Sequence, residues 1–130
     1  MLKIDLQQYK LPGSYRRGGR ECFLDPVRQR LIVQTPEEIV RQQMVEFLCE
    51  ELKVPRHCIK LEIPMSDFEK GAKGRADIVV FTVEEDYRYP VLVVECKAPS
   101  IQLIDDVFEQ VAEYNEILGA VAIMTTNGVE

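Results

Sequence analysis

The sequence predicts an α/β (α+β) fold in which a mixed central sheet is flanked by helices. Three observations carry this prediction: a helix with a clear start, three strand-like apolar segments after it, and a second helix followed by a fourth such segment. The expected order is therefore α, β, β, β, α, β. The chain has 130 residues, a length that fits one domain and can bury a core without metal or disulfide staples.

The first helix has a well-defined N-terminus. Thr35 is a good N-cap, Pro36 suits the first helical position, and Glu38 fits the third position of a capping box. The helix should run to about Leu52 and end before Pro55. Its apolar residues recur at helical spacing. They are Val40, Met44, Phe47, Leu48 and Leu52.

Three strands are expected next. Residues 59–63 alternate between apolar and charged side chains, which predicts a half-buried strand. Residues 76–83 and 91–97 are almost continuously apolar and flank the acidic turn 84–86, so they should be central strands. Two hairpins would make these three strands antiparallel.

A second helix is expected at about 104–118, with Gly119 after its C-terminus and a fourth strand at 120–125. This helix is a crossover, so the fourth strand should lie parallel to the third in a right-handed connection. The helix should turn its apolar side chains inward. These are Ile104, Val107, Phe108, Val111 and Leu118.

The N-terminal region differs in charge from the rest. Residues 1–34 carry seven Lys/Arg and three Asp/Glu, a net charge of +4, within a chain of net charge −6. Residues 22–24 and 31–33 predict a small hairpin, whereas the glycine- and arginine-rich residues 13–20 predict a flexible basic loop. We divide the chain into a flexible basic segment, 1–21, and a domain, 22–130. The loop is either a solvated surface segment or an arm that contacts phosphates.

Polar residues inside the apolar strands are the candidate site. Glu95 and Lys97 are two residues apart and so share one face, and Asp77 opens the neighbouring strand. Ionised groups are rarely buried unless they are paired or bind a metal. Two carboxylates suit Mg²⁺, with the backbone carbonyl of Cys96 as a further ligand. The alternative is an ion pair of Lys97 with Glu95 or Asp77 at a strand end.

The pattern of Asp77 followed by Glu95-Cys96-Lys97 resembles the PD-(D/E)xK nuclease signature. The surrounding sequence resembles the N-terminal nuclease domain of the R subunit of type I restriction enzymes, in the small stand-alone bacterial form, over residues 22–130. The matching segments are 25–28, 35–38, 75–80, 93–99, 110–114 and 126–128. The family continues into another strand after 126–128. The resemblance implies a restriction-endonuclease-like αβββαβ core, Mg²⁺ held by Asp77 and Glu95 with Mn²⁺ as a substitute, and Lys97 as the catalytic lysine.

The resemblance adds further candidates around this centre. Gln110 and Tyr114 are four residues apart on one helix face and could hold the catalytic lysine or a phosphate. The alternative is that Tyr114 is ordinary amphipathic packing and Gln110 a surface residue. The family adds a glutamate from the first helix. Glu38 has a local role in the capping box, whereas Glu37 lies within about 20° of the apolar stripe on a helical wheel. We favour Glu37, whose alternative is an ion pair with Arg41.

The function implied is Mg²⁺-dependent hydrolysis of DNA phosphodiester bonds, with an endonuclease favoured. The residues expected to contact nucleic acid are Arg16, Arg17, Arg20, Lys73 and Arg75. Two alternatives stay open: a catalytically silent nucleic-acid or protein binding module on the same fold, and a structure-selective, resolvase-like homodimer. The expected partners are DNA and a homodimer or larger restriction or repair assembly. No apolar run approaches the ~20 residues of a membrane span, and no signal pattern opens the chain, so we expect a cytoplasmic protein.

Overall fold

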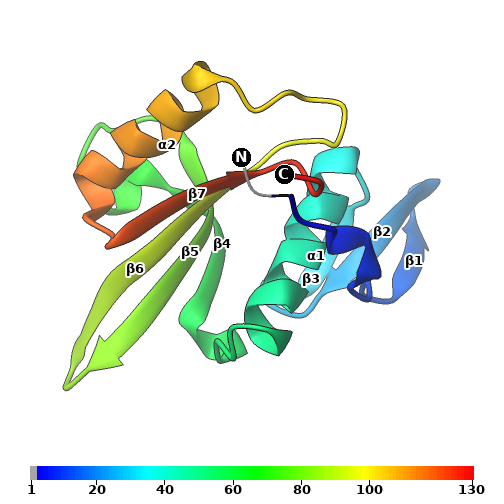
Figure 1. Ribbon diagram of the computed structural model, residues 1–130. Helices are drawn as coiled ribbons and strands as arrows, with labels where there is room; N and C mark the ends of the chain where they lie inside the picture. Colours follow the sequence, from blue (N-terminus) through cyan, green and yellow to red (C-terminus); the bar gives the residue numbers. More distant parts are fainter. Residues whose placement is uncertain (1–2) are drawn as a thin grey trace.

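The computed structural model describes residues 3–130 and is an α+β structure with two α-helices and two sheets (Figure 1). The helices are α1 (Pro36–Glu50) and α2 (Asp105–Leu118). The strands are β1 (Ser14–Arg17), β2 (Arg20–Asp25), β3 (Arg30–Val33), β4 (Ile59–Pro64), β5 (Arg75–Glu84), β6 (Tyr87–Cys96) and β7 (Ala122–Thr126). Three short 3₁₀-helices are η1 (Leu6–Gln8), η2 (Arg56–Cys58) and η3 (Met65–Asp67). The predicted fold class is confirmed.

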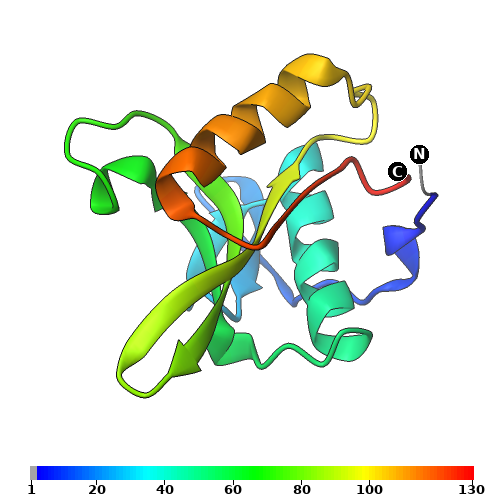
Figure 2. The ribbon, with the colours of Figure 1, turned by 60° about the vertical axis from the view of Figure 1, so that its left-hand side comes forward.

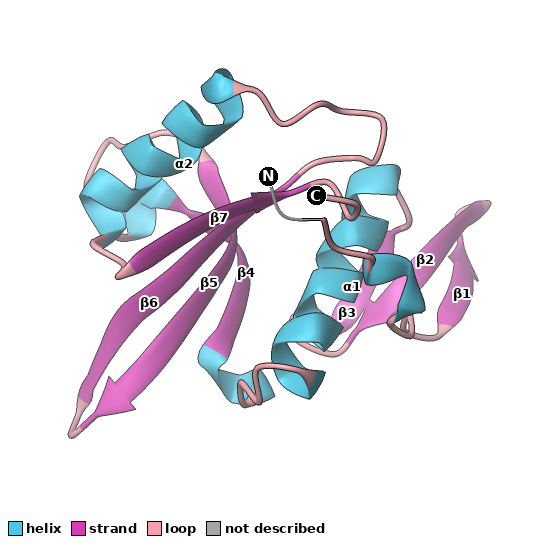
Figure 3. Ribbon diagram, in the orientation of Figure 1, coloured by secondary structure: helices cyan, strands magenta, loops and turns pink. Residues whose placement is uncertain are grey.

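The larger sheet has the strand order β4-β5-β6-β7 (Figure 3). β4 and β6 each pair antiparallel with β5, and β7 pairs parallel with β6 after the crossover through α2. This is the topology that the sequence predicts from α1 onward. The β5–β6 hairpin is longer than expected, because β6 begins at Tyr87 rather than at residue 91.

The two helices cover opposite faces of the larger sheet (Figure 2). The core on the α1 side includes Met44 and Leu48 together with sheet residues such as Ile78 and Val94. The core on the α2 side includes Val111, Val79 and Val93 among others. Alternate residues of each strand therefore enter different cores, as the two-residue period of a strand requires.

The helix ends follow their local sequence signals in part. Thr35 Oγ1 accepts a hydrogen bond from the Glu38 backbone N–H over 3.0 Å, and Gly119 ends α2 in the left-handed region with φ of 68°. Ile104 is the N-cap of α2, and its side chain and that of Phe108 are exposed rather than inward as predicted. Among residues 3–130, no helix combines the length and the apolar character needed to cross a bilayer.

The N-terminal region corrects one prediction. Residues 14–17 form β1, which pairs with β2 and encloses Gly18 and Gly19 in the turn, so the expected loop at 13–20 is largely a strand and its hairpin turn. β2 also pairs with β3, which confirms the predicted hairpin. Sequence patterns missed β1 because its polar residues are all exposed and only the partner strand orders them.

The same region is joined to the rest of the molecule. Leu6 and Tyr9 are buried in the α1-side core, and the backbone N–H groups of Ile4 and Leu6 donate to the carbonyls of Val129 and Gly128 over 3.1 Å each. In Figure 1, α1 stands between the small sheet and the large one. Of the segment 1–21 that the sequence analysis separated, residues 1–2 lie outside the described part. β2 crosses the proposed boundary at residues 21 and 22.

Candidate active site

Asp77 and Glu95 lie opposite each other on neighbouring strands. In the β5–β6 hairpin, Ile78 pairs with Val94 and Val79 with Val93, so the same register brings Asp77 to Glu95. Both residues are buried, with exposed fractions of 6% and 5%. Two carboxylates have therefore been taken out of water side by side, an arrangement that is costly without a nearby positive charge.

Asp77 is held at both of its carboxylate oxygens. Arg41 Nη2 on α1 donates to Asp77 Oδ1 over 3.0 Å, and the Cys96 backbone N–H donates to Asp77 Oδ2 over 2.7 Å. These charge-assisted hydrogen bonds fix the side chain between the helix and β6.

Glu95 has a different environment. Its Oε1 lies 3.7 Å from Lys97 Nζ, which confirms that the two side chains share a face. Its Oε2 is buried and has no hydrogen-bond partner among residues 3–130. Burial and then the charge of Asp77 raise the pKa of Glu95 to about 8, although Lys97 acts in the opposite direction. A cation placed between the two carboxylates would favour the ionised form of Glu95.

Arg41 is the main site residue that the sequence analysis did not place in the site, since the sequence indicated only an ion pair with Glu37. Its guanidinium lies 2.5 Å from Glu38, 3.0 Å from Glu37 and 3.5 Å from Glu62, besides its bond to Asp77. Burial lowers the pKa of Arg41, but the charges of Asp77 and Glu38 outweigh that effect and raise it above its ordinary value. Arg41 therefore stays charged and neutralises the α1 side of the cluster.

A second arginine ties this cluster to the small sheet. Arg28, in the β2–β3 turn, bonds to Asp25, to Glu38 over 2.7 Å and to Glu62 over 2.9 Å. Asp25 and Glu38 are buried, and Arg28 connects the turn to α1 and to β4. In the sequence, the spacing of three residues between Asp25 and Arg28 indicates an ion pair between them. No local pattern identifies Glu38 and Glu62 as further partners of Arg28.

The two helix-one glutamates have distinct roles. Glu38 does not complete a capping box, because the Thr35 N–H donates to the Val33 carbonyl and the Glu38 carboxylate binds the two arginines. That part of the prediction is wrong. Glu37 is half-exposed and forms the anticipated ion pair with Arg41. Burial and the charge of Asp77 raise the pKa of Glu37, whereas Arg41 and Lys97 lower it, so Glu37 lies within electrostatic reach of the site.

Gln110 and Tyr114 contact each other on α2. Gln110 Nε2 donates to Tyr114 Oη over 3.3 Å. Gln110 also lines, with Lys97, a cavity of about 440 Å³ at the α2 side of the site. The other lining residues are Asp106, Val107, Glu109 and Glu113. Tyr114 packs against the α2-side core and against Gly74, so within this pair Gln110 is the residue that shares the cavity with Lys97.

Cys96 enters the site through its backbone. Its side chain is fully buried in the α1-side core, where burial raises the pKa of the thiol well above its ordinary value. The thiol therefore stays protonated and is a poor metal ligand. The carbonyl of Cys96 as a ligand remains a prediction.

The donor set suits a cation that keeps much of its water. Within residues 3–130, no three His, Cys, Asp or Glu side chains are arranged as a ready-made metal site. Asp77 and Glu95 supply two carboxylates, and Glu95 Oε2 is a buried oxygen that no other described residue pairs with. Mg²⁺ is commonly held by one or two carboxylates together with water and substrate phosphates, so these residues fit it.

The expected nucleic-acid contacts fall in two places, and all are exposed. Lys73, in the loop before β5, and Arg75, its first residue, precede Asp77, whereas Arg16, Arg17 and Arg20 surround the β1–β2 turn. Arg16 lies 3.5 Å from Glu21, an exposed pair of little energetic value. The first group therefore lies near the carboxylates in sequence, and the second lies on the small sheet.

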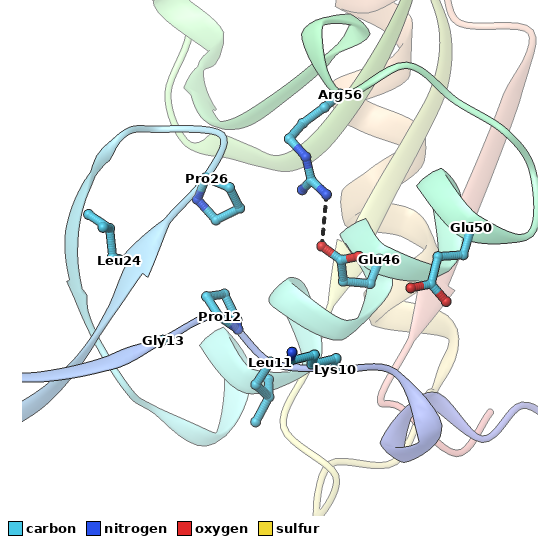
Figure 4. Close-up of a pocket in the computed structure, with 9 residues that line it drawn as sticks. All are labelled: Lys10, Leu11, Pro12, Gly13, Leu24, Pro26, Glu46, Glu50 and Arg56. Carbon is cyan, nitrogen blue, oxygen red and sulfur yellow. Dashed lines mark hydrogen bonds and ion pairs between the residues drawn. The ribbon is translucent and has the colours of Figure 1, made fainter.

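A separate cavity of about 380 Å³ lies between residues 10–13, the small sheet and α1 (Figure 4). Its lining includes the ion pair of Arg56 with Glu46, whose Nη2 and Oε1 atoms are 2.9 Å apart. None of the site residues expected from the sequence lines this cavity. The candidate site is therefore the strand-end cluster and not this cavity.

The fold and the site together define the class of this protein. It is an α+β domain that carries two paired carboxylates and a lysine at the ends of two central strands. Comparison with protein families matches residues 36–130 to the family described as type I restriction enzyme R protein N terminus, and the chain belongs to this family. The match spans α1 to the last residue and leaves β1–β3 outside it. No curated protein and no solved structure matches the chain. Membership indicates a function related to restriction nucleases.

Proposed function

We propose that this chain hydrolyses phosphodiester bonds of DNA in a reaction that depends on Mg²⁺, as an endonuclease of the PD-(D/E)xK type. The observation that carries the proposal is the convergence of Asp77, Glu95 and Lys97. The two carboxylates face each other across β5 and β6, and Lys97 Nζ lies 3.7 Å from Glu95 Oε1. Family membership supports the same reading.

Each site residue has a proposed role. Asp77 and Glu95 would hold the ion, together with the Cys96 carbonyl, and Mn²⁺ would substitute for Mg²⁺. The ion, when bound, polarises a phosphate oxygen and lowers the pKa of a bound water. Lys97 orients the attacking water, and Gln110, across the shared cavity, orients Lys97 or a phosphate. Glu37 adds negative charge at the α1 side of the site.

DNA is the proposed partner. The chain has a net charge of −6, so local basic groups have to supply the attraction to the backbone. Lys73 and Arg75, just before Asp77, would contact the phosphates next to the scissile bond. Arg16, Arg17 and Arg20 would contact the backbone farther away.

Replacing these three arginines with glutamine should weaken DNA binding and reduce its salt dependence, measured by fluorescence anisotropy at several salt concentrations.

Cleavage of plasmid DNA in Mg²⁺ tests the proposal. Asp77→Asn and Lys97→Ala should each lower the rate by at least ~100-fold, because they remove ion binding and water orientation. Lys60→Ala is the matched control, since Lys60 is an exposed lysine on β4. Circular dichroism would verify that all three variants fold. Retention of wild-type rates by both site variants would refute the assignment.

One observation favours a catalytically silent binding module as the second candidate. Arg41 already neutralises Asp77 at 3.0 Å, so the cluster is partly compensated without an ion. Titration with Mn²⁺ followed by calorimetry separates the two candidates. The nuclease requires binding that Asp77→Asn abolishes, whereas a binding module requires no ion at this place.

A further inference from the structure

Thr125 extends the row of polar side chains across a third strand. In the parallel β6–β7 pair, Glu95 is in register with Thr125. Two residues earlier, Val93 and Ile123 both pack in the α2-side core. Because side chains alternate between faces, Glu95 and Thr125 return to that same face. Asp77, Glu95 and Thr125 therefore lie on β5, β6 and β7, which are neighbours in that order in the sheet.

Thr125 is buried, and its hydroxyl has no hydrogen-bond partner in the part of the chain that the structure describes. Its exposed fraction is 7%, and Thr125 Oγ1 is buried and unpaired, as is Glu95 Oε2 on the adjoining strand. Buried polar atoms in native proteins are nearly always paired, so two unpaired atoms on facing residues require an explanation. A valine would fill the same space without that cost.

The chemistry of the two groups is complementary. An ionised carboxylate only accepts hydrogen bonds, whereas a threonine hydroxyl can donate one. Neighbouring strands lie about 4.8 Å apart, so paired side chains on one face can meet after a rotation about a side-chain bond. Hydrogen bonds to the ligands of a metal orient them and raise affinity.

We propose that Thr125 is a positioning residue of the metal site, whose hydroxyl donates to the Glu95 carboxylate when an ion is bound. This inference rests on the proposed function, since it requires a divalent ion at Asp77 and Glu95. Thr125 itself does not touch the ion. It holds the orientation of a group that does.

Mn²⁺ binding by the full chain, measured by calorimetry, tests the inference without any activity assay. Thr125→Val should raise the Mn²⁺ Kd about tenfold, and Thr125→Ser, which keeps the hydroxyl, should stay within about twofold of the wild type. Thr82→Val is the matched control, because Thr82 is an exposed threonine on β5. Thermal denaturation without metal should show Thr125→Val at least as stable as the wild type, because it removes an unpaired buried hydroxyl.

The outcomes separate the inference from the function on which it rests. An unchanged Mn²⁺ Kd in Thr125→Val, beside an Asp77-dependent wild-type site, overturns the role of Thr125 and leaves the nuclease proposal standing. Equal weakening in the valine and serine variants also overturns it, because the hydroxyl is then irrelevant. Absence of Asp77-dependent binding in the wild type overturns the metal site itself. Should Thr125→Val fail to fold, Thr125→Ala provides the same comparison with serine.

Discussion

The two sides of the Asp77–Glu95 pair differ in how their charges are compensated. On the α1 side, Arg28 and Arg41 bind the buried carboxylates of Asp25, Glu38 and Asp77 through short contacts. On the β6–β7 side, the described residues give Glu95 one cationic neighbour, Lys97 at 3.7 Å, and leave one of its carboxylate oxygens unpaired.

This difference separates charged groups that stabilise the fold from a charged group that only a bound ligand would compensate. Buried charges that are paired with arginine join the small sheet, α1 and the large sheet, and removing one partner leaves the other uncompensated. A buried carboxylate with an unpaired oxygen and a raised pKa carries a cost that the folded chain does not relieve by itself. Such groups are frequent at functional sites.

The largest expected effect is on the compensated side. Glu38→Ala removes a carboxylate that binds both Arg28 and Arg41, so it should lower the free energy of unfolding by about 3–5 kcal/mol. Glu37→Ala is the control, because Glu37 is half-exposed and forms one ion pair, and it should cost less than about 1 kcal/mol. Urea denaturation at pH 7 measures both. Equal losses would contradict the distinction between the two glutamates.

The next effect is on the uncompensated side and depends on pH. Burial and the charge of Asp77 raise the pKa of Glu95 from 4.5 to about 8, so the folded state keeps a proton that the unfolded state releases. Between pH 5 and 8 the stability contributed by this group therefore falls as pH rises. Glu95→Gln should remove this dependence and be more stable than the wild type at pH 8, by an amount on the order of 3 kcal/mol without divalent ions.

Urea denaturation at pH 5, 6, 7 and 8 in the presence of a chelator measures this difference. The gap between Glu95→Gln and the wild type should narrow toward pH 5. A difference in unfolding free energy that is constant across these pH values would mean that Glu95 ionises normally in the folded protein. The proposed contrast between a compensated and an uncompensated side would then be contradicted.

A smaller effect is expected where α2 supports the site. A Cβ atom on Gly74 would lie 2.4 Å from Tyr114 Oη, and the φ of Gly74 is 89°. Gly74→Ala should therefore cost roughly 2–3 kcal/mol. Gly71→Ala, at φ of 83° with open space around it, should cost roughly 1 kcal/mol, and thermal denaturation compares the two. Equal losses of stability in the two variants would show that the Tyr114 side chain moves away from the added methyl group at no cost.

The smallest effect is expected for the hydroxyl of Tyr114. Its contact with Gln110 Nε2 is long, at 3.3 Å, so Tyr114→Phe should change the free energy of unfolding by about 0.5 kcal/mol. Cleavage kinetics of this variant indicate whether the hydroxyl orients Gln110. A large loss of stability would instead show that the Tyr114 hydroxyl stabilises the fold, as the arginine-bound carboxylates on the α1 side do.

Sequence patterns predicted much of the fold from residue 22 onward, because its signals are local. The N-cap at Thr35, the left-handed Gly119 and the two-residue alternation of the strands depend on neighbours a few positions away. The outward direction of Ile104 and Phe108 was not predictable, because helical periodicity marks apolar residues without showing where α2 meets the sheet. β1 was missed because it consists of exposed polar residues that only β2 orders.

The sequence by itself determined the order of elements from α1 onward, the hairpin that brings Asp77 to Glu95, and the shared face of Glu95 and Lys97, since these follow from strand period and turn position. Only the tertiary structure decided the distant partners of Arg28 and Arg41 and the burial of Thr125 beside Glu95. Such contacts join residues distant in the chain. Their energy depends on desolvation and on the exact approach of elements, which no local spacing encodes.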